Sequence, residues 1–338
     1  MLDSLVEGVL QGNQRATARL ISQVENDGAA AQAAIAALYP ATGHAHVIGV
    51  TGPPGSGKST LVNAIATAYA ASGRKVGVIA VDPSSPFTGG ALLGDRVRMT
   101  DLATNNDIFV RSMASRGTLG GLARTTAVVI KILDAAGYDP VIVETVGAGQ
   151  AEVDIAAAAH SVLVIEAPGM GDEVQSIKAG ILEIADILVV NKADRPGAQR
   201  TVSALEMMLH MGSSGPVRHH GRLDDAGEEE HVGDDSEWQI PVLQTVAVEN
   251  RGIKEVMAGL DAHHTHLQTS GEWLNRERRR SGQEIEQLVH GRFAAMLAGA
   301  VSKTERDALA TAVAERRLTA YEAALTLFEG TLAISGTE

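Results

Sequence analysis

The sequence predicts an α/β protein whose mostly parallel sheet is covered by helices on both faces. Short apolar runs alternate with helical patterns from residue 45 to residue 268, one run leads into a glycine-rich loop, and another ends in Asn-Lys-Ala-Asp. The runs are 47–51, 76–81, 108–110, 141–143, 161–166, 187–190 and 241–246. Such alternation is typical of parallel sheets with both faces buried. Ligands of these sheets bind at the carboxyl ends of the strands, where each motif below lies.

Helical patterns flank this central domain. In residues 1–44, apolar side chains recur three and four positions apart, which predicts an N-terminal helical extension packed on the main domain. Residues 269–338 are helical again, and their apolar stripe lies outside the sheet. The stripe consists of Leu309, Val313, Leu318, Tyr321, Leu325 and Phe328. We therefore expect a C-terminal dimerisation arm, with packing on the chain's own domain as the alternative.

The composition limits the classes of function. Hydrophobic residues make up 45% of the 338 residues, which is enough for a sizeable core. The formal net charge of −13 argues against a nucleic-acid surface or an anionic membrane as partner. No cysteine is present, which excludes disulfides and thiolate metal sites and fits a reducing compartment. We recognise neither a signal peptide nor an apolar run of membrane-spanning length, and therefore expect a cytoplasmic protein.

The glycine-rich loop after the first strand fits G-x-x-x-x-G-K-[ST], the phosphate-binding P-loop. Its residues are Gly52, Pro53, Pro54, Gly55, Ser56, Gly57, Lys58, Ser59 and Thr60. The spacing from Leu61 to Tyr69 predicts a helix directly after it. Backbone N–H groups of the loop and the helix dipole would then favour phosphate. Lys58 is expected to reach the β- and γ-phosphates, and the Ser59 hydroxyl to ligate Mg²⁺.

A second motif indicates which base the nucleotide carries. The apolar run 187–190 ends in Asn191, Lys192, Ala193 and Asp194, an N-K-x-D sequence. Guanine offers two donors on one edge, its ring N–H and its exocyclic amine, and the Asp194 carboxylate can accept both. Adenine lacks this donor pair, so a site built on these hydrogen bonds rejects it strongly. The two motifs together predict GTP and GDP as ligands.

Carboxylates also follow two other strands. Asp82 ends the strand 76–81, and Asp95 follows in a loop rich in small residues. Because Mg²⁺ keeps several waters and takes only one or two carboxylates, we do not expect both to bind it directly. Either one has a helix cap or a turn as its alternative role.

The strand 141–143 continues into a sequence that resembles the D-x-x-G motif of GTPases, with Glu144 in place of the aspartate. Glu144 would hold the Mg²⁺ shell or orient the attacking water, and Gly147 would donate its N–H to the γ-phosphate. Ras-like GTPases place a water-orienting glutamine directly after this glycine. Here Ala148 follows, and Gln150 comes three residues after Gly147, so we expect slow hydrolysis until a partner completes the site.

The end of the last strand is expected to complete the guanine pocket. Val246, Ala247 and Val248 lie at this point, where guanine-site loops usually carry Ser-Ala. Val246 departs from that pattern, but Ala247 can still donate its backbone N–H to the guanine carbonyl. We therefore expect guanine binding to survive the change.

Six of the eleven histidines fall into two groups, and we predict that neither group binds metal. His219, His220 and His231 belong to the first, in the acidic insert 212–237, where no ligand spacing is recognisable. A solvated loop is the expected structure there. His263, His264 and His266 belong to the second, near a helix end, where we expect them to face solvent.

Taken together, these motifs resemble one family, the GTPases that chaperone methylmalonyl-CoA mutase, called MeaB and in older usage ArgK, an arginine-transport kinase. The resemblance covers residues 1–330 apart from the insert. It rests on G-P-P-G-S-G-K-S-T at 52–60, V-D-P-S-S-P at 81–86, T-G-G at 88–90, L-G-D at 93–95, S-R-G-T-L-G-G-L at 115–122, V-E-T-V-G at 143–147, G-D-E-V-Q-S-I-K-A-G-I at 171–181 and N-K-A-D at 191–194.

The resemblance implies a GTP-hydrolysing homodimer with a P-loop GTPase domain at 45–268 and dimerisation through 269–338. It implies a role in loading adenosylcobalamin from a cobalamin adenosyltransferase onto an acyl-CoA mutase, and in protecting or reactivating that mutase. It also implies a switch at 167–178 that reports the nucleotide state to the mutase. Asp172, Gln175 and Lys178 match its contact residues. The acidic insert and Val246 are departures from the family.

Three alternatives stay open. A nickel-type metallochaperone GTPase shares this kind of nucleotide domain, but it needs metal ligands near its switches. A kinase acting on a transport-binding protein, as in the older ArgK name, would need a base for its protein acceptor, which we do not find. A GTP-binding scaffold that does not hydrolyse its nucleotide is disfavoured only by Glu144 and the expected Mg²⁺ ligands.

Overall fold

The computed structural model describes residues 2–25, 28–83, 102, 105–115, 121–145, 158–169, 183–212 and 238–335. The chain divides into two compact units, Met1–Arg276 and Glu277–Glu338, and each is described by itself. Within the described part of either unit, no helix is both long and apolar enough to cross a membrane.

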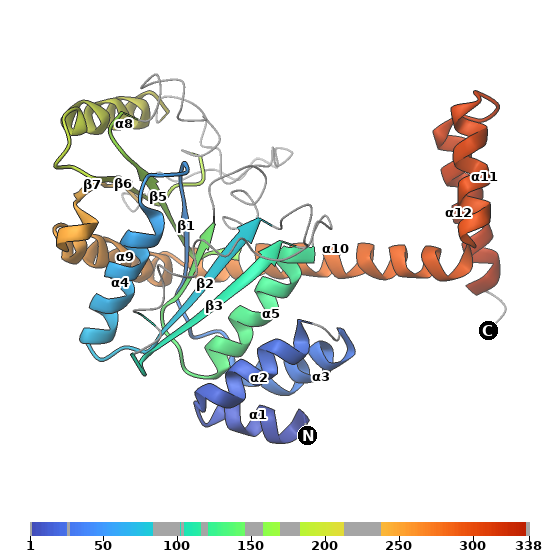
Figure 1. Cartoon of the computed structure of the whole chain (residues 1–338), viewed down its shortest axis with the longest axis horizontal. Helices are drawn as coiled ribbons and strands as arrows, with labels where there is room; N and C mark the ends of the chain where they lie inside the picture. Colours follow the sequence, from blue (N-terminus) through green and yellow to red (C-terminus); the bar gives the residue numbers. More distant parts are fainter. Residues whose placement is uncertain are drawn as a thin grey trace. The chain divides into compact units, whose positions relative to one another are not determined.

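The first unit is built on a parallel sheet of seven described strands (Figure 1). In chain order they are β1 (Val47–Thr51), β2 (Val76–Pro83), β3 (Ile108–Ser115), β4 (Val141–Thr145), β5 (Ser161–Glu166), β6 (Ile187–Asn191) and β7 (Val242–Thr245). Across the sheet the order is β3-β2-β4-β1-β5-β6-β7, and every neighbouring pair is parallel. Each apolar run that the sequence predicts as a strand overlaps one of them, so the predicted sheet is confirmed.

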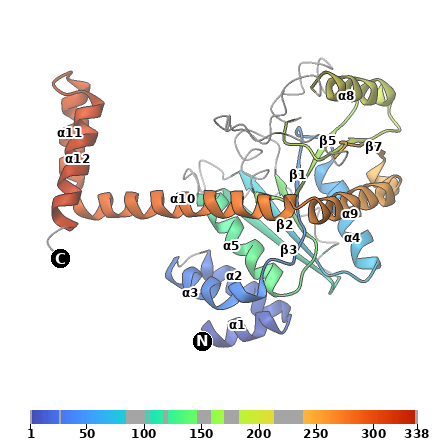
Figure 2. The same ribbon diagram turned by 180° about the vertical axis from the view of Figure 1, so that it is seen from behind.

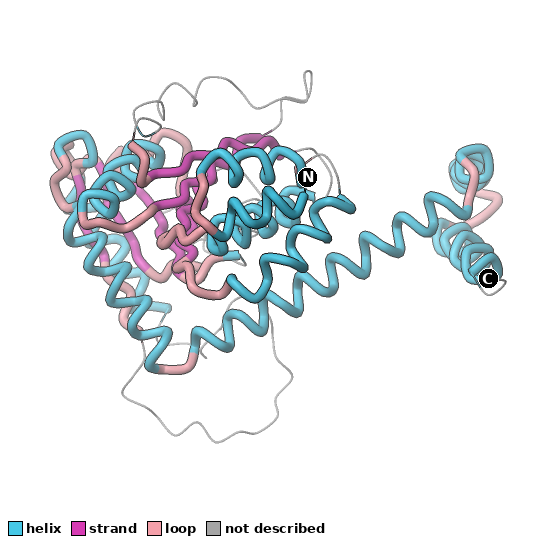
Figure 3. Tube along the Cα trace, turned by 90° about the horizontal axis from the view of Figure 1, so that it is seen from below, coloured by secondary structure: helices cyan, strands magenta, loops and turns pink. Residues whose placement is uncertain are grey.

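Both faces of the sheet are buried, because successive side chains of a strand point to opposite sides. Val47 of β1 belongs to one hydrophobic core, whereas Ile48 and Val50 belong to the other. The first core also takes residues of α5 (Gly121–Ala135) and α8 (Ala198–Gly212). The second is covered by α4 (Lys58–Ala71) and α9 (Ile253–Thr269). Figures 2 and 3 show the strands between these helices from two further directions.

Three N-terminal helices extend the first core. They are α1 (Leu2–Leu10), α2 (Gln14–Val24) and α3 (Gly28–Leu38), followed by the 3-10 turn η1 (Tyr39–Ala41). The Asn13 side chain caps α2 by accepting hydrogen bonds from the backbone N–H groups of its first turn. Leu20 and Leu38 are fully buried in the same core as Leu133 of α5. The predicted helical extension packed on the main domain is therefore present.

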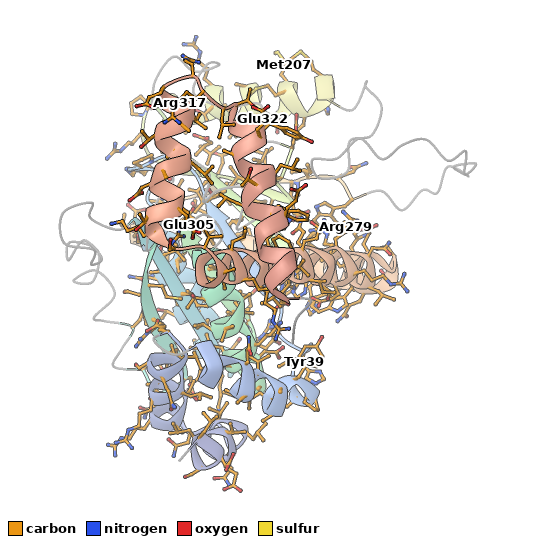
Figure 4. The ribbon with its side chains drawn as sticks, turned by 90° about the vertical axis from the view of Figure 1, so that its right-hand side faces the viewer. Tyr39, Met207, Arg279, Glu305, Arg317 and Glu322 are labelled. Carbon is orange, nitrogen blue, oxygen red and sulfur yellow. The ribbon has the colours of Figure 1, made fainter. Side chains whose placement is uncertain are left out.

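Helix α10 (Glu272–Ala300) carries the chain from the first unit into the second, which then consists of α11 (Lys303–Ala314) and α12 (Ala320–Ser335). Figure 4 shows α11 and α12 as a hairpin, with Glu305 at one end and Arg317 and Glu322 at the other. The Ser302 side chain and Glu305 form a capping box that begins α11. The predicted boundary at 268/269 falls at the end of α9, whereas the compact units divide after Arg276.

The second unit exposes many of its large apolar side chains. They are Ile285, Leu288, Val289, Met296, Tyr321, Leu325 and Phe328. Among the described side chains of this unit, Val301, Ala312 and Ala323 are buried. These exposed apolar side chains are compatible with the predicted dimerisation arm. The arm itself stays a prediction.

Candidate nucleotide site

The predicted P-loop joins the end of β1 to the first residue of α4, which is the context its function requires. Gly52 has a φ of +142°, and a Cβ there would lie 2.1 Å from the backbone oxygen of Ile165. Gly57 has a φ of +94°, and a Cβ there would lie 2.4 Å from Nδ2 of Asn191. Only glycine fits such close approaches. The loop is therefore packed directly against β5 and β6, and α4 begins at its last residues.

Lys58 and Ser56 give this loop its polar character. Lys58 is buried, and its Nζ donates to the carbonyl oxygens of Gly52 and Pro53 at 2.8 and 3.0 Å. The Ser56 hydroxyl is also buried, and no hydrogen-bond partner for it exists among the described residues. A buried cation, a free hydroxyl and a helix amino end together form a set of donors that fits a phosphate chain.

The first turn of α4 and the end of β4 bring two predicted Mg²⁺ ligands together. The Ser59 hydroxyl donates to Oε1 of Glu144 at 2.6 Å. Glu144 is 6% exposed and is paired in register with Val50 of β1, which places its carboxylate beside the P-loop. A hydroxyl and a carboxylate oxygen are ligands that suit Mg²⁺, so the residues present fit that ion.

Several predicted site residues cannot be compared with the structure. Asp82 lies in β2, one position beyond the pair Val81–Thr145, so its backbone reaches the same edge of the sheet. Other predicted residues lie outside the described part of the chain: Asp95, Gly147, Asp172, Gln175, Lys178 and the insert histidines His219, His220 and His231. Ala148 and Gln150 lie outside it as well. Their predicted roles remain predictions.

Asn191 of the N-K-x-D sequence connects three segments of the site. Its Nδ2 donates to the Ser56 carbonyl oxygen of the P-loop at 2.9 Å. Its Oδ1 accepts from the Thr245 hydroxyl at 3.1 Å and from the Ala247 N–H at 3.2 Å. Asn191 is 2% exposed, so these bonds are shielded from water. The side chain thus holds the P-loop and the end of β7 in one arrangement.

The other residues of the N-K-x-D motif, and those that follow β7, are in part exposed to solvent. Lys192 has a φ of +55°, and its Nζ donates to the Gly55 carbonyl oxygen at 2.6 Å. Asp194 is exposed, as a carboxylate that receives a ligand from solvent must be. Val246 and Ala247 are buried and Val248 is 79% exposed. Because the Ala247 N–H donates to Asn191, its predicted bond to the guanine carbonyl stays a prediction.

The sequence interpretation missed a buried polar network at the other end of the strands. It predicts that His263, His264 and His266 face solvent, and for His263 this is wrong: the side chain is 1% exposed. Its Nδ1 lies 2.7 Å from the Ser161 hydroxyl, and its Nε2 lies 3.3 Å from the Asp186 carboxylate. The available signal was the histidine directly before each of β1 and β5, His46 and His160.

No group of three or more histidine, aspartate or glutamate side chains within the described ranges forms a metal-binding arrangement. The contacts around His263 are its hydrogen bond to Ser161 and its contact with Asp186, and Asp186 also forms an ion pair with Arg276.

Comparison with known proteins agrees with this geometry. The chain is 44% identical over 324 residues to a protein of Pyrococcus abyssi, which covers 96% of this chain and 95% of that one. It is 37% identical over 282 residues to GTPase ArgK of Escherichia coli, covering 79% and 80% of the two chains. The methylmalonic aciduria type A homolog of Mus musculus, named as mitochondrial, is 42% identical over 147 residues, 44% of this chain and 35% of that one.

A solved structure has the same fold. The crystal structure of a LAO/AO transport system kinase superposes with a TM-score of 0.72 at 27% sequence identity, covering 97% of this chain and 96% of that chain. The family model described as methylmalonyl Co-A mutase-associated GTPase MeaB matches residues 17–302. With the P-loop, the Ser59–Glu144 contact and the Asn191 bonds in place, this match shows that the chain belongs to the MeaB family and is a P-loop GTPase.

Proposed function

We propose that this chain is a GTP-hydrolysing chaperone of an adenosylcobalamin-dependent acyl-CoA mutase, either methylmalonyl-CoA mutase or a close relative. It gates the loading of adenosylcobalamin, and it protects or reactivates the mutase. The observation that carries the proposal is the family match over residues 17–302, whose description names the mutase. The nucleotide site supplies the GTP binding and hydrolysis that would control this loading.

In this proposal the P-loop residues 52–60 bind the phosphates, and the Lys58 ammonium leaves its two loop carbonyls to contact the β- and γ-phosphates. Ser59 and Glu144 hold Mg²⁺, with either Asp82 or Asp95 completing its shell. When bound, Mg²⁺ neutralises charge that develops on the transferred phosphoryl group. Gly147 donates its N–H to the γ-phosphate. As an alternative to holding the Mg²⁺ shell, Glu144 orients the attacking water; its burial beside the P-loop supports either role.

Guanine specificity is assigned to Asn191, Lys192 and Asp194, with Val246, Ala247 and Val248 forming the far wall. Asp194→Asn should weaken GTP binding and favour xanthosine nucleotides, because the amide N–H₂ pairs with the xanthine carbonyl. Glu249→Gln, an exposed carboxylate beyond the pocket, is the matched control and should change neither affinity. Equal affinity of the parent protein for GTP and ATP would refute this assignment.

The mutase partnership is tested by hydrolysis. The isolated chain should turn over GTP slowly, because Ala148 stands where Ras-like GTPases have a water-orienting glutamine. The cognate mutase should accelerate turnover, and by linkage its affinity should differ between the GTP-analogue and GDP states. Lys178→Ala should reduce both effects and spare GTP binding, if 167–178 relays the signal. Equal rates and equal affinities with every adenosylcobalamin-dependent mutase tested would leave a GTPase without this role.

Metal titration and the fate of the labelled phosphate separate the three alternatives. A nickel-type metallochaperone GTPase would bind nickel tightly in a metal titration. A transport-protein kinase would leave labelled phosphate on a protein acceptor, whereas the proposed function releases it as inorganic phosphate. A scaffold that does not hydrolyse GTP would release none.

Homodimerisation is proposed through the exposed apolar side chains of the second unit. Ile285 and Val289 lie four positions apart on α10 and are 61% and 56% exposed. The double change Ile285→Glu and Val289→Glu should yield a monomer by light scattering, because it places charge on the face that a partner would cover. Gln287→Glu adds a charge between them on the same helix and should leave the dimer intact. A dimer that survives the double change would contradict the arm.

A further inference from the structure

A buried polar network fixes the beginning of α10 on the first unit. Its members come from five places in the chain: His46 before β1, Ser161 at the start of β5, Asp186 before β6, His263 on α9 and Arg276 on α10. Because β1, β5 and β6 are parallel, all three strands begin at this edge of the sheet and end at the nucleotide loops. The network therefore lies at the opposite edge of the sheet from the P-loop, and the proposed function uses none of it.

The contacts form a continuous chain. His46 Nε2 lies 2.6 Å from the Ser161 hydroxyl, which lies 2.7 Å from His263 Nδ1. His263 Nε2 lies 3.3 Å from Oδ1 of Asp186, and Arg276 donates to both oxygens of that carboxylate at 2.8 and 3.0 Å. Arg276 also donates to the His160 carbonyl oxygen at 2.5 Å. The first turn of α10 is thereby bonded to the amino ends of β5 and β6.

The order Ser161–His263–Asp186 has the form of a hydrolase triad, but the surroundings exclude that chemistry. The Ser161 side chain is fully buried and accepts or donates only within the network. No substrate carbonyl can approach it, and the Asp186 carboxylate is already held by Arg276. The chain of contacts therefore acts on the position of α10 rather than on a substrate.

The hydrogen-bond donors and acceptors of the network match when the rings of His46 and His263 are neutral. With neutral rings, His263 Nε2–H donates to Asp186, so its Nδ1 accepts from the Ser161 hydroxyl. Ser161 then accepts from His46 Nε2–H. A proton added to His263 Nδ1 turns the Ser161 hydroxyl toward His46 and moves the His46 proton to Nδ1. That atom is buried and has no hydrogen-bond partner among the described residues.

The neighbouring His160 is subject to the same restriction. The backbone N–H of Val47 donates to His160 Nδ1 at 2.9 Å, so this nitrogen must stay unprotonated for the contact to exist. His160 also stacks on Trp273 of α10, with ring centroids 3.8 Å apart. Trp273 further lies 5.0 Å from the His264 ring. The His160 ring, on which Trp273 stacks, is thus held by a hydrogen bond that exists only while Nδ1 is unprotonated.

We propose that this network is an acid-released latch: it holds the first turn of α10 on the sheet when its histidines are neutral, and proton uptake by the His46–Ser161–His263 chain releases that turn.

The electrostatics agree in sign. Burial, with the charge of Arg276 and the neighbouring histidines, lowers the pKa of His263 to about 4 despite Asp186. Burial first, and then His264, His160, His263 and Arg74, lower the pKa of His46. Burial raises the pKa of Asp186, but Arg276 and His263 outweigh it and the pKa is lowered. The remaining titratable neighbours of the latch are His266, which faces His263, and Asp139 and Asp261, which face His264.

A histidine with a lowered pKa stabilises the closed latch fully above the ordinary value of 6.5 and loses that effect as the pH falls. If the pKa of His263 returns to 6.5 on opening, the closed-to-open ratio falls by about 80-fold between pH 6.5 and pH 4. His46 adds to the change in the same direction. Release of the first turn of α10 therefore occurs at acidic pH, and it is coupled to the uptake of more than one proton.

The chain carries its own reporters, because Trp238 contacts the latch and Trp273 lies on the first turn of α10 that the latch holds. Trp273 stacks on His160, as described above. Trp238 lies 4.8 Å from the His263 ring, and its Nε1 donates to the Asp186 carbonyl oxygen at 2.8 Å. The Trp238→Phe protein leaves Trp273 as the single tryptophan. The emission of Trp273 then reports directly on the environment of the first turn of α10.

The test is a pH titration of Trp273 emission in the full-length Trp238→Phe protein, with far-UV circular dichroism and fluorescent-GDP binding measured in parallel. We expect a reversible red shift with a midpoint between pH 4 and 6.5, at a higher pH than any loss of helical signal or of GDP binding. Adding His263→Asn should remove about one proton from the slope of the transition. Arg276→Met should give red-shifted emission already at pH 7.5.

Arg278→Met, which removes an exposed arginine two residues further along the same helix, is the matched control and should titrate like the parent. If the emission of the parent protein changes only together with the helical signal, the network is an ordinary part of the core and the latch is rejected. A slope that His263→Asn leaves unchanged, in a protein that still binds GDP, rejects it as well.

Discussion

Replacing Asn191 by alanine should weaken both the fold and nucleotide binding, because one side chain serves both. Asn191 is 2% exposed and makes three hydrogen bonds, to the Ser56 carbonyl, the Thr245 hydroxyl and the Ala247 N–H. The alanine variant removes all three and leaves their partners in a space too confined for free access of water. Its effect can therefore be estimated bond by bond.

Each net hydrogen bond contributes about 1 kcal/mol, so the free energy of unfolding of the first unit should fall by about 3 kcal/mol. The contact to Ser56 differs from the other two, because it alone restrains the P-loop. Loss of that contact should cost about 1.4 kcal/mol of binding, which lowers GDP affinity about tenfold. The affinity change thus comes from the amide nitrogen alone, whereas the stability change comes from all three bonds.

Thr245→Val separates the two effects. It removes the hydroxyl that donates to Asn191 Oδ1 and leaves the bond to Ser56, so stability should fall by about 1 kcal/mol with GDP affinity unchanged. Urea unfolding gives the first quantity and titration with fluorescent GDP the second. If Asn191→Ala binds GDP like the parent, or if Thr245→Val loses affinity as strongly, the reasoning is refuted.

Three further predictions concern other parts of the chain. Gly52→Ala places a Cβ 2.1 Å from the Ile165 oxygen at a φ of +142°, so it should abolish measurable GDP binding, whereas Gly73→Ala, at an open turn with a φ of +90°, should retain it. Lys58→Ala removes a charge-assisted phosphate contact and should weaken GTP binding by about 10- to 150-fold; unchanged affinity by calorimetry would contradict the P-loop assignment. Ser302→Ala removes the capping box of α11 and should destabilise that helix by about 1 kcal/mol, seen as faster hydrogen exchange over 303–306, with no change in GDP affinity.

The sheet could be predicted from the sequence because buried parallel strands carry a continuous apolar signal. Ile187 to Val190, for example, are all buried, since alternate side chains fill the two cores. The nucleotide loop could be predicted for a related reason. Its requirements for glycine and lysine are local, and they are met within nine consecutive residues, 52–60.

The contacts that join distant segments could not be predicted in this way. Asn191 was assigned to guanine binding from its motif, but its bonds to Ser56 and Ala247 depend on the order of β1, β5, β6 and β7 in space. His263 was expected at the surface because it lies near the end of a helix. It is buried because Trp238 and the start of α10 cover that face of α9, and no local pattern contains this information.

The two strands β1 and β5 connect the nucleotide loop with the latch. At their carboxyl ends, Gly52 packs against the backbone of Ile165. At their amino ends, His46 contacts Ser161, and the pair Ile48–Ser161 sets the register between the strands. The two strands span only about 17 and 20 Å, so a shift of one strand along the other changes both contacts together. If nucleotide binding biases that shift, reciprocity requires GDP to move the pH midpoint of Trp273 emission by as much as acid changes GDP affinity. A midpoint that is the same with and without saturating GDP would mean that the sheet transmits nothing between its two edges.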